Sequence, residues 1–456
     1  MARRLSLLVA ALVALALPGH ASACKTLVVT KASVVYPHER TIQGAVDKAR
    51  PCDWILIAPG VYPESVKIRT SRLHLRGLDR NRVIVDGAHR KGVNGIEVVK
   101  ADGVWIENLT VRNFDRATSD GEDGNQIWWN GGDESGTIGL HGWYGSYLTA
   151  YDTGLLGGYG LFTANAVGGE WDRIYASGFN DAGIYLGACR DCRATISHAL
   201  VERNALGYSG TNSGGHIVVQ DSVFRLNAVG VGPNSLANTD PPPPQLGTCA
   251  AGANRSGTPT IASTGVARCT IFRRNRIERN NNLTTPANST TAQLAWGVGI
   301  ELPGVYGDLF SENVVTGNQN FGILGFENPD PFPPTDKTVY FQLSGNRFER
   351  NTVSGSKLAD IALEGGLFGA KQSVNNCFAG NRYRKSLPAD LAPWDCANAT
   401  TPNPDLATSQ ALVGTIVTLQ GESQARHSRG QPAPPPQPTM PNPCRGAPKN
   451  PLCPAG

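Results

Sequence analysis

Aromatic and polar residues recur directly after glycine-apolar pairs, at a spacing that would bring them together in space. Four such glycines are separated by 23, 24 and 23 residues: Gly160, Gly183, Gly207 and Gly230. If the residue after each glycine points inward, its successor points outward, because side chains alternate along a strand. The outward column that this alternation predicts is Glu97, Trp128, Phe162, Tyr185, Ser209, Gly232 and Glu301.

This column predicts a sugar-binding surface. Aromatic rings on adjacent coils would form a flat strip with steps of roughly 4.8 Å, suited to the apolar faces of sugar rings. The predicted binding residues, with polar neighbours that would hydrogen-bond a glycan, are Trp128, Phe162, Tyr185, Ser209, Asn212 and His216. The alternative is that the same rings stack as a ladder covered by the rest of the chain.

Tyr185, with Asp181 or Glu301, is the predicted place for proton transfer. Removing the proton next to a uronate carboxylate requires a base and a cation that neutralises the carboxylate. Tyrosine serves as that base only where a nearby cation lowers its pKa from about 10. Asp181 and Glu301 would instead suit glycoside hydrolysis if they lie about 5 to 10 Å apart.

Calcium is the one cofactor that the sequence leaves open. The run Asp120–Asn125 offers hard oxygen ligands, but its spacing departs from the calcium-loop pattern and is also typical of a solvated turn. No residue is therefore assigned as a metal ligand.

The period of the chain indicates how these residues are positioned. An apolar-x-x-Asn motif recurs, for example at Val201–Asn204, Phe224–Asn227 and Ile277–Asn280. A period near 23 with short strands, glycine at each strand start and asparagine at the bends predicts coils stacked about 4.8 Å apart. The predicted fold is all-β, a right-handed parallel β-helix of about ten coils.

Two segments near the start resemble a known group. Thr41–Ala49, followed by Asp53–Glu64, is similar to the opening of right-handed parallel β-helix proteins of the pectin-lyase-like superfamily. The resemblance implies a short helix that caps the first coil, and Ile42, Ala45, Val46 and Ala49 give it one apolar face. The signature motifs of the superfamily's epimerases, pectate lyases and pectin methylesterases are not found, so it implies the fold and leaves the activity open.

Ten cysteines fall into neighbours in sequence, which predicts local disulfides in an exported chain. The predicted pairs are Cys24 with Cys52, Cys189 with Cys192, Cys249 with Cys269, Cys377 with Cys396, and Cys444 with Cys453. The Cys189-x-x-Cys192 spacing also occurs in redox and zinc sites, but a structural disulfide on a turn is the preferred interpretation.

The two ends of the chain differ from its middle in composition. Residues 1–23 combine a basic start with a short apolar run, which is typical of a secretory signal. Residues 24–396 are assigned to the β-helix, and residues 397–456 to a proline-rich C-terminal tail. No stretch after the signal is apolar enough to predict a membrane span, and Cys24 leaves a lipid anchor as an alternative.

The sequence as a whole predicts a secreted β-helix that binds extracellular polysaccharide. A uronate-polysaccharide lyase is the enzyme class considered, and a non-catalytic surface or structural protein is the alternative. The 456 residues carry a formal charge of +4, which gives no reason to expect nucleic acid as a partner. The expected partner is a polysaccharide or surface glycan, and the expected state is a monomer.

Overall fold

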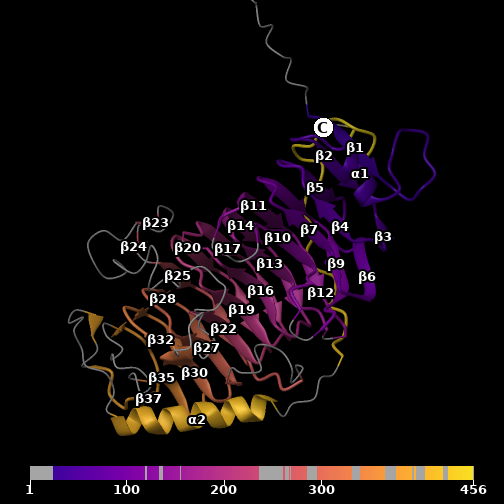
Figure 1. Cartoon of the computed structure of the whole chain (residues 1–456). Helices are drawn as coiled ribbons and strands as arrows, with labels where there is room; N and C mark the ends of the chain where they lie inside the picture. Colours follow the sequence, from indigo (N-terminus) through magenta and orange to yellow (C-terminus); the bar gives the residue numbers. More distant parts are fainter. Residues whose placement is uncertain are drawn as a thin grey trace, which may run out of the picture.

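Three long parallel sheets run the length of the molecule in this computed structural model (Figure 1). The structure describes residues 24–118, 121–132, 137–154, 156–189, 191–235, 260–261, 266–267, 269–284, 295–330, 339–364, 376–392, 395–396, 406–424 and 430–454. The predicted signal segment, 1–23, lies outside these residues.

The chain visits the three sheets in turn. Sheet A contains β1 (Thr26–Val29), β2 (Trp54–Ile57), β5 (His74–Gly77), β8 (Val104–Glu107), β11 (Leu140–Ser146), β14 (Ala166–Asp172), β17 (Ala194–Ser197), β20 (Ile217–Gln220), β25 (Thr270–Arg273), β28 (Leu309–Ser311), β33 (Arg347–Glu349) and β36 (Cys377–Ala379). Sheet B contains β3 (Gly60–Tyr62), β6 (Val83–Lys91), β9 (Thr110–Asp115), β12 (Thr149–Tyr151), β15 (Tyr175–Ser177), β18 (Leu200–Glu202), β21 (Val223–Arg225), β26 (Arg276–Glu278), β29 (Val314–Thr316) and β34 (Thr352–Ser354).

Sheet C carries the predicted site. It contains β4 (Val66–Ile68), β7 (Ile96–Val99), β10 (Ile127–Asn130), β13 (Leu161–Ala164), β16 (Ala182–Gly187), β19 (Leu206–Thr211), β22 (Val229–Asn234), β27 (Val298–Pro303), β30 (Phe321–Phe326), β35 (Ala359–Leu363) and β37 (Ser386–Leu387). Two small antiparallel pairs lie outside the three sheets, β23 (Thr260–Ile261) with β24 (Val266–Ala267) and β31 (Asn328–Asp330) with β32 (Val339–Phe341).

One coil consists of one strand from each sheet. The chain passes from β16 in sheet C to β17 in sheet A, then to β18 in sheet B, and returns to sheet C as β19. Every strand pair within the three sheets is parallel, with the members of a pair coming from successive coils. The fold is a right-handed parallel β-helix, as predicted, and the 11 strands of sheet C agree with about ten coils.

Side chains inside the coils stack in rows along the axis. Four phenylalanines of sheet A form one inward stack with ring centroids 4.9 to 5.3 Å apart: Phe272, Phe310, Phe348 and Phe378. The asparagines of the repeated motif form ladders at the bends. For example, the backbone N–H of Asn204 donates to Asn227 Oδ1, and that of Asn227 donates to Asn280 Oδ1. These ladders satisfy backbone groups that the bends leave outside the sheets.

A short helix covers the first coil, as the sequence predicts. Helix α1 (Ile42–Lys48) begins after Thr41, whose side chain accepts from Gly44 N, and it buries Ile42, Ala45 and Val46. The Glu64 carboxylate accepts from the backbone N–H groups of Ile42 and Gln43 at 2.9 Å each. An acidic group at this end also complements the helix dipole. The open end of the core is thereby closed.

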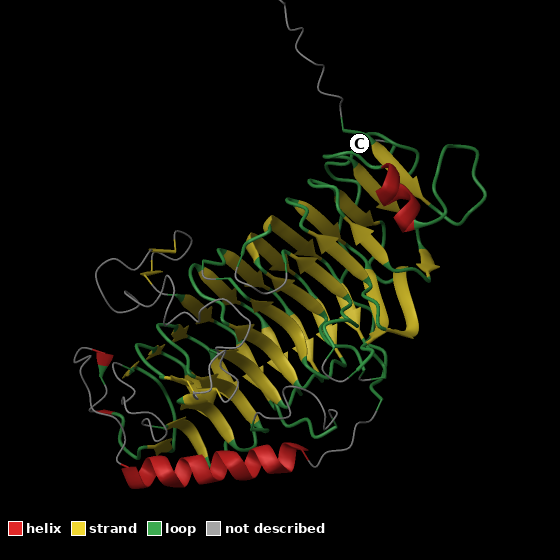
Figure 2. Cartoon of the chain, viewed as in Figure 1, coloured by secondary structure: helices red, strands yellow, loops and turns green. Residues whose placement is uncertain are grey.

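The C-terminal residues pack against the coils. Helix α2 (Leu406–Gln424) lies along the last strands of sheet C at the bottom of Figures 1 and 2, and it buries Leu412, Ile416 and Leu419 there. Residues 430–454 then run back to the first coils. Gln431 N donates to Thr153 O, and Thr26 Oγ1 donates to Pro448 O near the opposite end. The described part of the predicted tail therefore lies along the solenoid, and its residues 430–454 are called the C-terminal strap below.

Four of the five predicted disulfides are confirmed. They join Cys24 to Cys52, Cys189 to Cys192, Cys377 to Cys396, and Cys444 to Cys453. Cys269 is also disulfide-bonded, but its predicted partner Cys249 lies outside the described residues. The Cys189–Cys192 pair is a structural disulfide here, and four local bridges are typical of proteins folded in an oxidising compartment.

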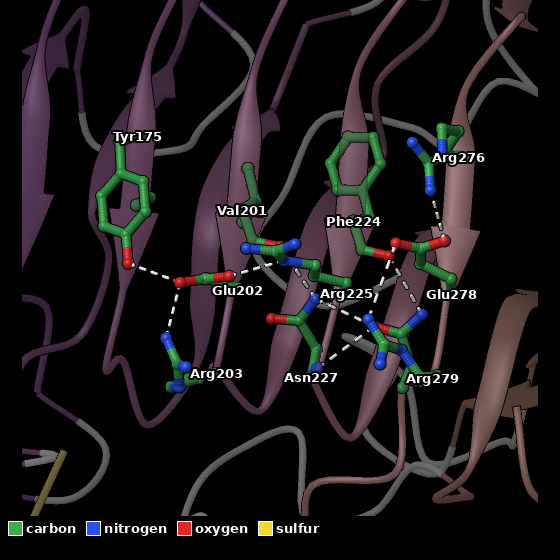
Figure 3. A network of polar contacts seen from close by, with 12 residues as sticks. Tyr175, Val201, Glu202, Arg203, Phe224, Arg225, Asn227, Arg276, Glu278 and Arg279 are labelled. Atoms are coloured by element: carbon green, nitrogen blue, oxygen red, sulfur yellow. Dashed lines mark hydrogen bonds and ion pairs between the residues drawn. The ribbon is translucent and has the colours of Figure 1, made fainter. Parts of the chain in front are cut away.

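The outward face of sheet B carries paired charges (Figure 3). Glu202 accepts from Tyr175 OH at 2.9 Å and from Arg225 Nε at 2.7 Å, and Arg203 pairs with it from the same coil. Glu278 pairs with Arg276 at 3.0 Å on a later coil. Each carboxylate on this part of the face therefore has a cationic partner within its own or the adjacent coil.

Candidate functional site

The predicted outward column exists in the predicted register. Strand pairing places Glu97, Trp128, Phe162, Tyr185, Ser209 and Gly232 next to one another in sequence of coils. Glu301 follows on β27 and pairs with Leu324 of β30. Sequence alternation alone was sufficient for this alignment, because the inward partners Ile127, Leu161 and Ile184 are all buried in the core.

The aromatic side chains of this column do not form the predicted flat, exposed strip. The rings of Trp128 and Phe162 stack on each other with centroids 4.9 Å apart and planes 14° apart, and Tyr185 meets Phe162 edge-on. Trp128, Phe162 and Tyr185 are only 9%, 1% and 6% exposed. Rings held one strand spacing apart pack face to face with their neighbours, so their faces are not available to a sugar. The covered ladder, the alternative, is the arrangement observed.

The segment before β13 helps to cover this ladder. Tyr159 packs its ring against Phe162 and Tyr185 at centroid distances of 4.7 and 5.0 Å. Tyr159 itself is half-buried, so part of this residue reaches the surface. At Gly158 an added Cβ would lie 2.5 Å from Arg116 Nε, so a larger residue there would displace the guanidinium.

Arg116 connects Tyr159 to the predicted residue Asp181. Its guanidinium lies 5.1 Å from the Tyr159 ring centroid and also hydrogen-bonds the Tyr159 side chain. Arg116 Nη2 lies 3.3 Å from Asp181 Oδ2, and both side chains are buried. Burial by itself lowers the pKa of Arg116, but attraction to Asp181 and Tyr159 outweighs this and raises it. Arg116 therefore stays charged, and the cluster Arg116, Tyr159, Asp181 and Tyr185 is named the arginine–tyrosine cluster below.

Glu301 lies apart from this cluster. It is three strand spacings from Tyr185 along sheet C, which amounts to about 14 Å. Asp181 comes from the same coil as Tyr185, so Asp181 and Glu301 are not brought together as the carboxylate pair considered for hydrolysis. Of the three predicted catalytic residues, Tyr185 and Asp181 are linked only indirectly, through Tyr159 and Arg116, because four residues of extended chain, about 13 Å, separate them.

Glu301 has an unusual environment of its own. The side chain is fully buried, its Oε1 accepts from Ala295 N at 3.2 Å, and its Oε2 has no hydrogen-bond partner among the residues that the structure describes. Burial raises the pKa of this carboxyl to about 8, and the hydrogen bond from Ala295 offsets only part of the effect. The Glu301 carboxyl is therefore protonated and uncharged at neutral pH.

The remaining predicted binding residues have different surroundings. Ser209 and Asn212 are buried on and after β19. His216 precedes β20 of sheet A, where its Nδ1 lies 2.6 Å from Asp191 Oδ1. His216 is therefore engaged by a carboxylate on a bend, away from the column.

The proposed calcium loop is partly described. Asp123 Oδ1 accepts from Ala117 N at 2.7 Å, so this carboxylate closes its own loop, and Asp120 lies outside the described residues. Among the residues that the structure describes, three side chains suited to a metal come together elsewhere, at His89, Asp115 and Asp152.

Sequence reasoning missed Arg116 and Tyr159. Tyr159 precedes the glycine that opens β13, so the repeat itself marks its position, but nothing in the repeat indicates that its ring turns over the column. Arg116 follows β9 in a different coil. No spacing rule places it beside Asp181, because 65 residues separate the two in sequence.

The sequence matches no known family description, and no curated protein matches it. Its structure is similar to the mannuronan C-5 epimerase AlgE6 A-module of Azotobacter vinelandii, with a TM-score of 0.47 and 14% identity over 75% of this chain and 90% of that one. It is also similar to pectin methylesterase PemA of Erwinia chrysanthemi, with a TM-score of 0.39 and 15% identity over 74% and 90%. Pectate lyase Pel9A gives a TM-score of 0.40 and 12% identity over 83% and 82%. At this similarity no residue role is transferred.

No helix in the described part of the chain is both long and apolar enough to span a bilayer.

Proposed function

We propose that this protein is exported, acts as a monomer and binds an acidic extracellular polysaccharide at the outward face of sheet C, where it acts as a uronate-polysaccharide lyase. The observation that carries the proposal is the arginine–tyrosine cluster. A buried, charged guanidinium in contact with a tyrosine that reaches the surface is the cation-and-base combination that proton removal next to a uronate carboxylate requires.

Each member of the cluster has a role in this proposal. Arg116 neutralises the uronate carboxylate and favours the ionised form of the adjacent phenol. Tyr159 is the base nearest the surface, and Tyr185, the base predicted from the sequence, lies behind it with ring centroids 5.0 Å apart. Asp181 holds Arg116 in place through the 3.3 Å contact. The phenolate oxygen takes the proton from the sugar carbon next to the carboxylate, the carbon–oxygen bond to the leaving sugar breaks to give a carbon–carbon double bond, and the phenol returns that proton to the leaving oxygen.

The alternative is a non-catalytic surface or structural β-helix. The burial of Trp128, Phe162 and Tyr185 favours it, because a stacked ladder stabilises the solenoid without any ligand. In a non-catalytic protein of this kind, the loss of one phenolic hydroxyl would change no enzymatic activity.

The experiment compares two tyrosine variants on uronate polymers. Purified protein is incubated with alginate or polygalacturonate, and absorbance near 235 nm reports the unsaturated product. Tyr159→Phe should abolish product formation because it removes the acid-base oxygen. Tyr144→Phe, a half-buried tyrosine on the outward face of sheet A, is the matched control and should leave the rate unchanged.

Two results would contradict the proposal. No absorbance change and no retention of the wild type on gels of either polymer would favour the passive alternative. Product formation that Tyr159→Phe leaves intact would show that the arginine–tyrosine cluster is not the site. Export is tested separately, since cleavage after residue 23 predicts Cys24 as the first residue of the mature protein.

A further inference from the structure

Three consecutive coils bring a histidine and two aspartates together beside sheet B. His89 lies in an irregular part of β6, Asp115 ends β9, and Asp152 directly follows β12. His89 Nδ1 is 3.3 Å from Asp115 Oδ1 and 3.7 Å from Asp152 Oδ1. All three ligand atoms lie within 4.8 Å of one another. None of these residues belongs to the arginine–tyrosine cluster.

The hydrogen bonds around His89 fix which ring nitrogen carries a proton. Asn113 Oδ1 accepts from Thr153 N at 3.1 Å, which identifies this atom as the oxygen of the amide. The Thr153 hydroxyl, 3.2 Å away, therefore donates to it. The Thr153 oxygen, having donated its hydrogen, can only accept from His89 Nε2 at 3.2 Å. His89 thus carries a proton on Nε2, and its Nδ1 faces the two carboxylates.

Two carboxylates and a nitrogen lone pair cannot face one another without a cation between them. Asp115 and Asp152 are each 1% exposed, and an uncompensated charge at that depth is costly. The compensating positive charge is either a proton held within the cluster or a metal ion.

We propose that His89 Nδ1, Asp115 Oδ1 and Asp152 Oδ1 form a binding site for a divalent transition-metal ion of the zinc class. In a tetrahedron with metal–ligand bonds of about 2.0 to 2.1 Å, neighbouring ligands lie about 3.3 to 3.4 Å apart. The two nitrogen–oxygen distances, 3.3 and 3.7 Å, match this with a shift of a few tenths of an ångström. A calcium ion prefers six to eight oxygen ligands, so the imidazole favours zinc.

The surroundings complete the features of such a site. The contact between His89 Nε2 and Thr153 orients the ring in the way that outer hydrogen bonds orient metal-bound histidines. The carboxylate oxygen of Asp152 that does not face His89 accepts from Leu156 N and Gly157 N, so the proposed ligand oxygen is held in position. The His89 side chain is 44% exposed, which gives the ion a path from solvent. Three protein ligands leave one position open for water.

A metal ion at this site would link three coils that also contact the C-terminal strap. Thr153, next to the ligand Asp152, accepts from Gln431 N of that strap, and Asp152 accepts from Leu156 N, three residues before Tyr159. The inference stands on its own geometry and does not depend on the proposed lyase activity.

The test uses full-length protein stripped with a chelator and titrated with ZnCl₂ in a calorimeter. One zinc should bind per chain, and the melting temperature should rise as zinc is added. Co²⁺ in place of zinc should give the intense visible absorption of a tetrahedral N/O site. His89→Ala should lower the zinc affinity at least 100-fold, and His89→Gln is the second variant should the first fail to fold.

The matched control is His198→Ala. His198 Nδ1 lies 2.7 Å from Asp172 Oδ1 and is exposed to a similar extent. No third ligand joins this pair within the described part of the chain, so the control should bind zinc as the wild type does. The proposal is overturned if the stripped wild type binds no zinc at 100 µM, or if His89→Ala and His89→Gln bind as tightly as the wild type. The first result would show that the compensating charge is a proton held within the cluster, and the second would show that the bound zinc lies elsewhere.

Discussion

The outward faces of sheet B and sheet C have the same backbone geometry but opposite chemistry. On sheet B, Glu202 and Glu278 each contact arginines, and those arginines reach solvent. On sheet C, Glu301 sits among buried apolar residues, and no cation of the described residues contributes to its pKa shift. The strands of both faces are parallel and in register, so the backbone does not cause the difference.

What differs is the set of neighbouring groups. Helix α2 and the segment carrying Tyr159 pack onto sheet C, whereas the glutamates of sheet B contact tyrosine and arginine side chains of their own and neighbouring coils. Covering a face removes water, which raises the cost of an unpaired charge and favours stacked rings. An outward glutamate therefore stays charged on sheet B, where partly exposed arginines pair with it, and is a neutral acid on sheet C.

The largest expected effect is the pH dependence due to Glu301. Its folded-state pKa of about 8 lies above the ordinary value of 4.5. The stability that this proton confers is fully present below pH 4.5 and is lost as the pH rises through 8. A shift of this size corresponds to on the order of 5 kcal/mol. Glu301→Gln should remove this fall in the free energy of unfolding, measured by urea titration at pH 5 and pH 8.5.

The matched control for this measurement is Glu278→Gln, on the other face, which should keep the wild-type difference between the two pH values. If the wild type and Glu301→Gln show equal differences, Glu301 is not a buried acid and the contrast between the two faces fails.

The next effect concerns the ring ladder. Trp128→Ala should lower the free energy of unfolding by about 3 to 5 kcal/mol, because it removes a buried indole stacked on Phe162. Glycan retention on an affinity gel should change little. A loss of retention with unchanged stability would show instead that Trp128 is an exposed platform, as the alternation in the sequence first suggested.

The smallest effect is expected on sheet B. Glu278→Gln should cost only about 0.2 to 1 kcal/mol at low salt, because Arg276 is largely exposed and water screens the pair. Raising the salt concentration should reduce the difference between wild type and variant further. A cost of several kcal/mol that salt leaves unchanged would mean that this face is also covered.

The sequence by itself determined the solenoid. The glycine spacing and the asparagine motif predicted the coils, Thr41–Ala49 predicted the cap, and alternation placed Trp128, Phe162, Tyr185 and Glu301 on one face in register. It also paired the four disulfides described here. Such features depend on neighbours one period apart, and a repeating sequence specifies those neighbours directly.

Only the tertiary structure decided what covers each face. The rings of the sheet C column are buried because they stack on one another and Tyr159 packs onto them, while α2 covers the later strands (Figure 1), and the repeat carries no information about such packing. Arg116 with Asp181, and His89 with Asp115 and Asp152, meet through bends and coils at separations that no period specifies. Chemistry at these positions depends on burial and on partners distant in sequence. Both are properties of the packed molecule, because the free energy of a charge is set by the water and the groups around it.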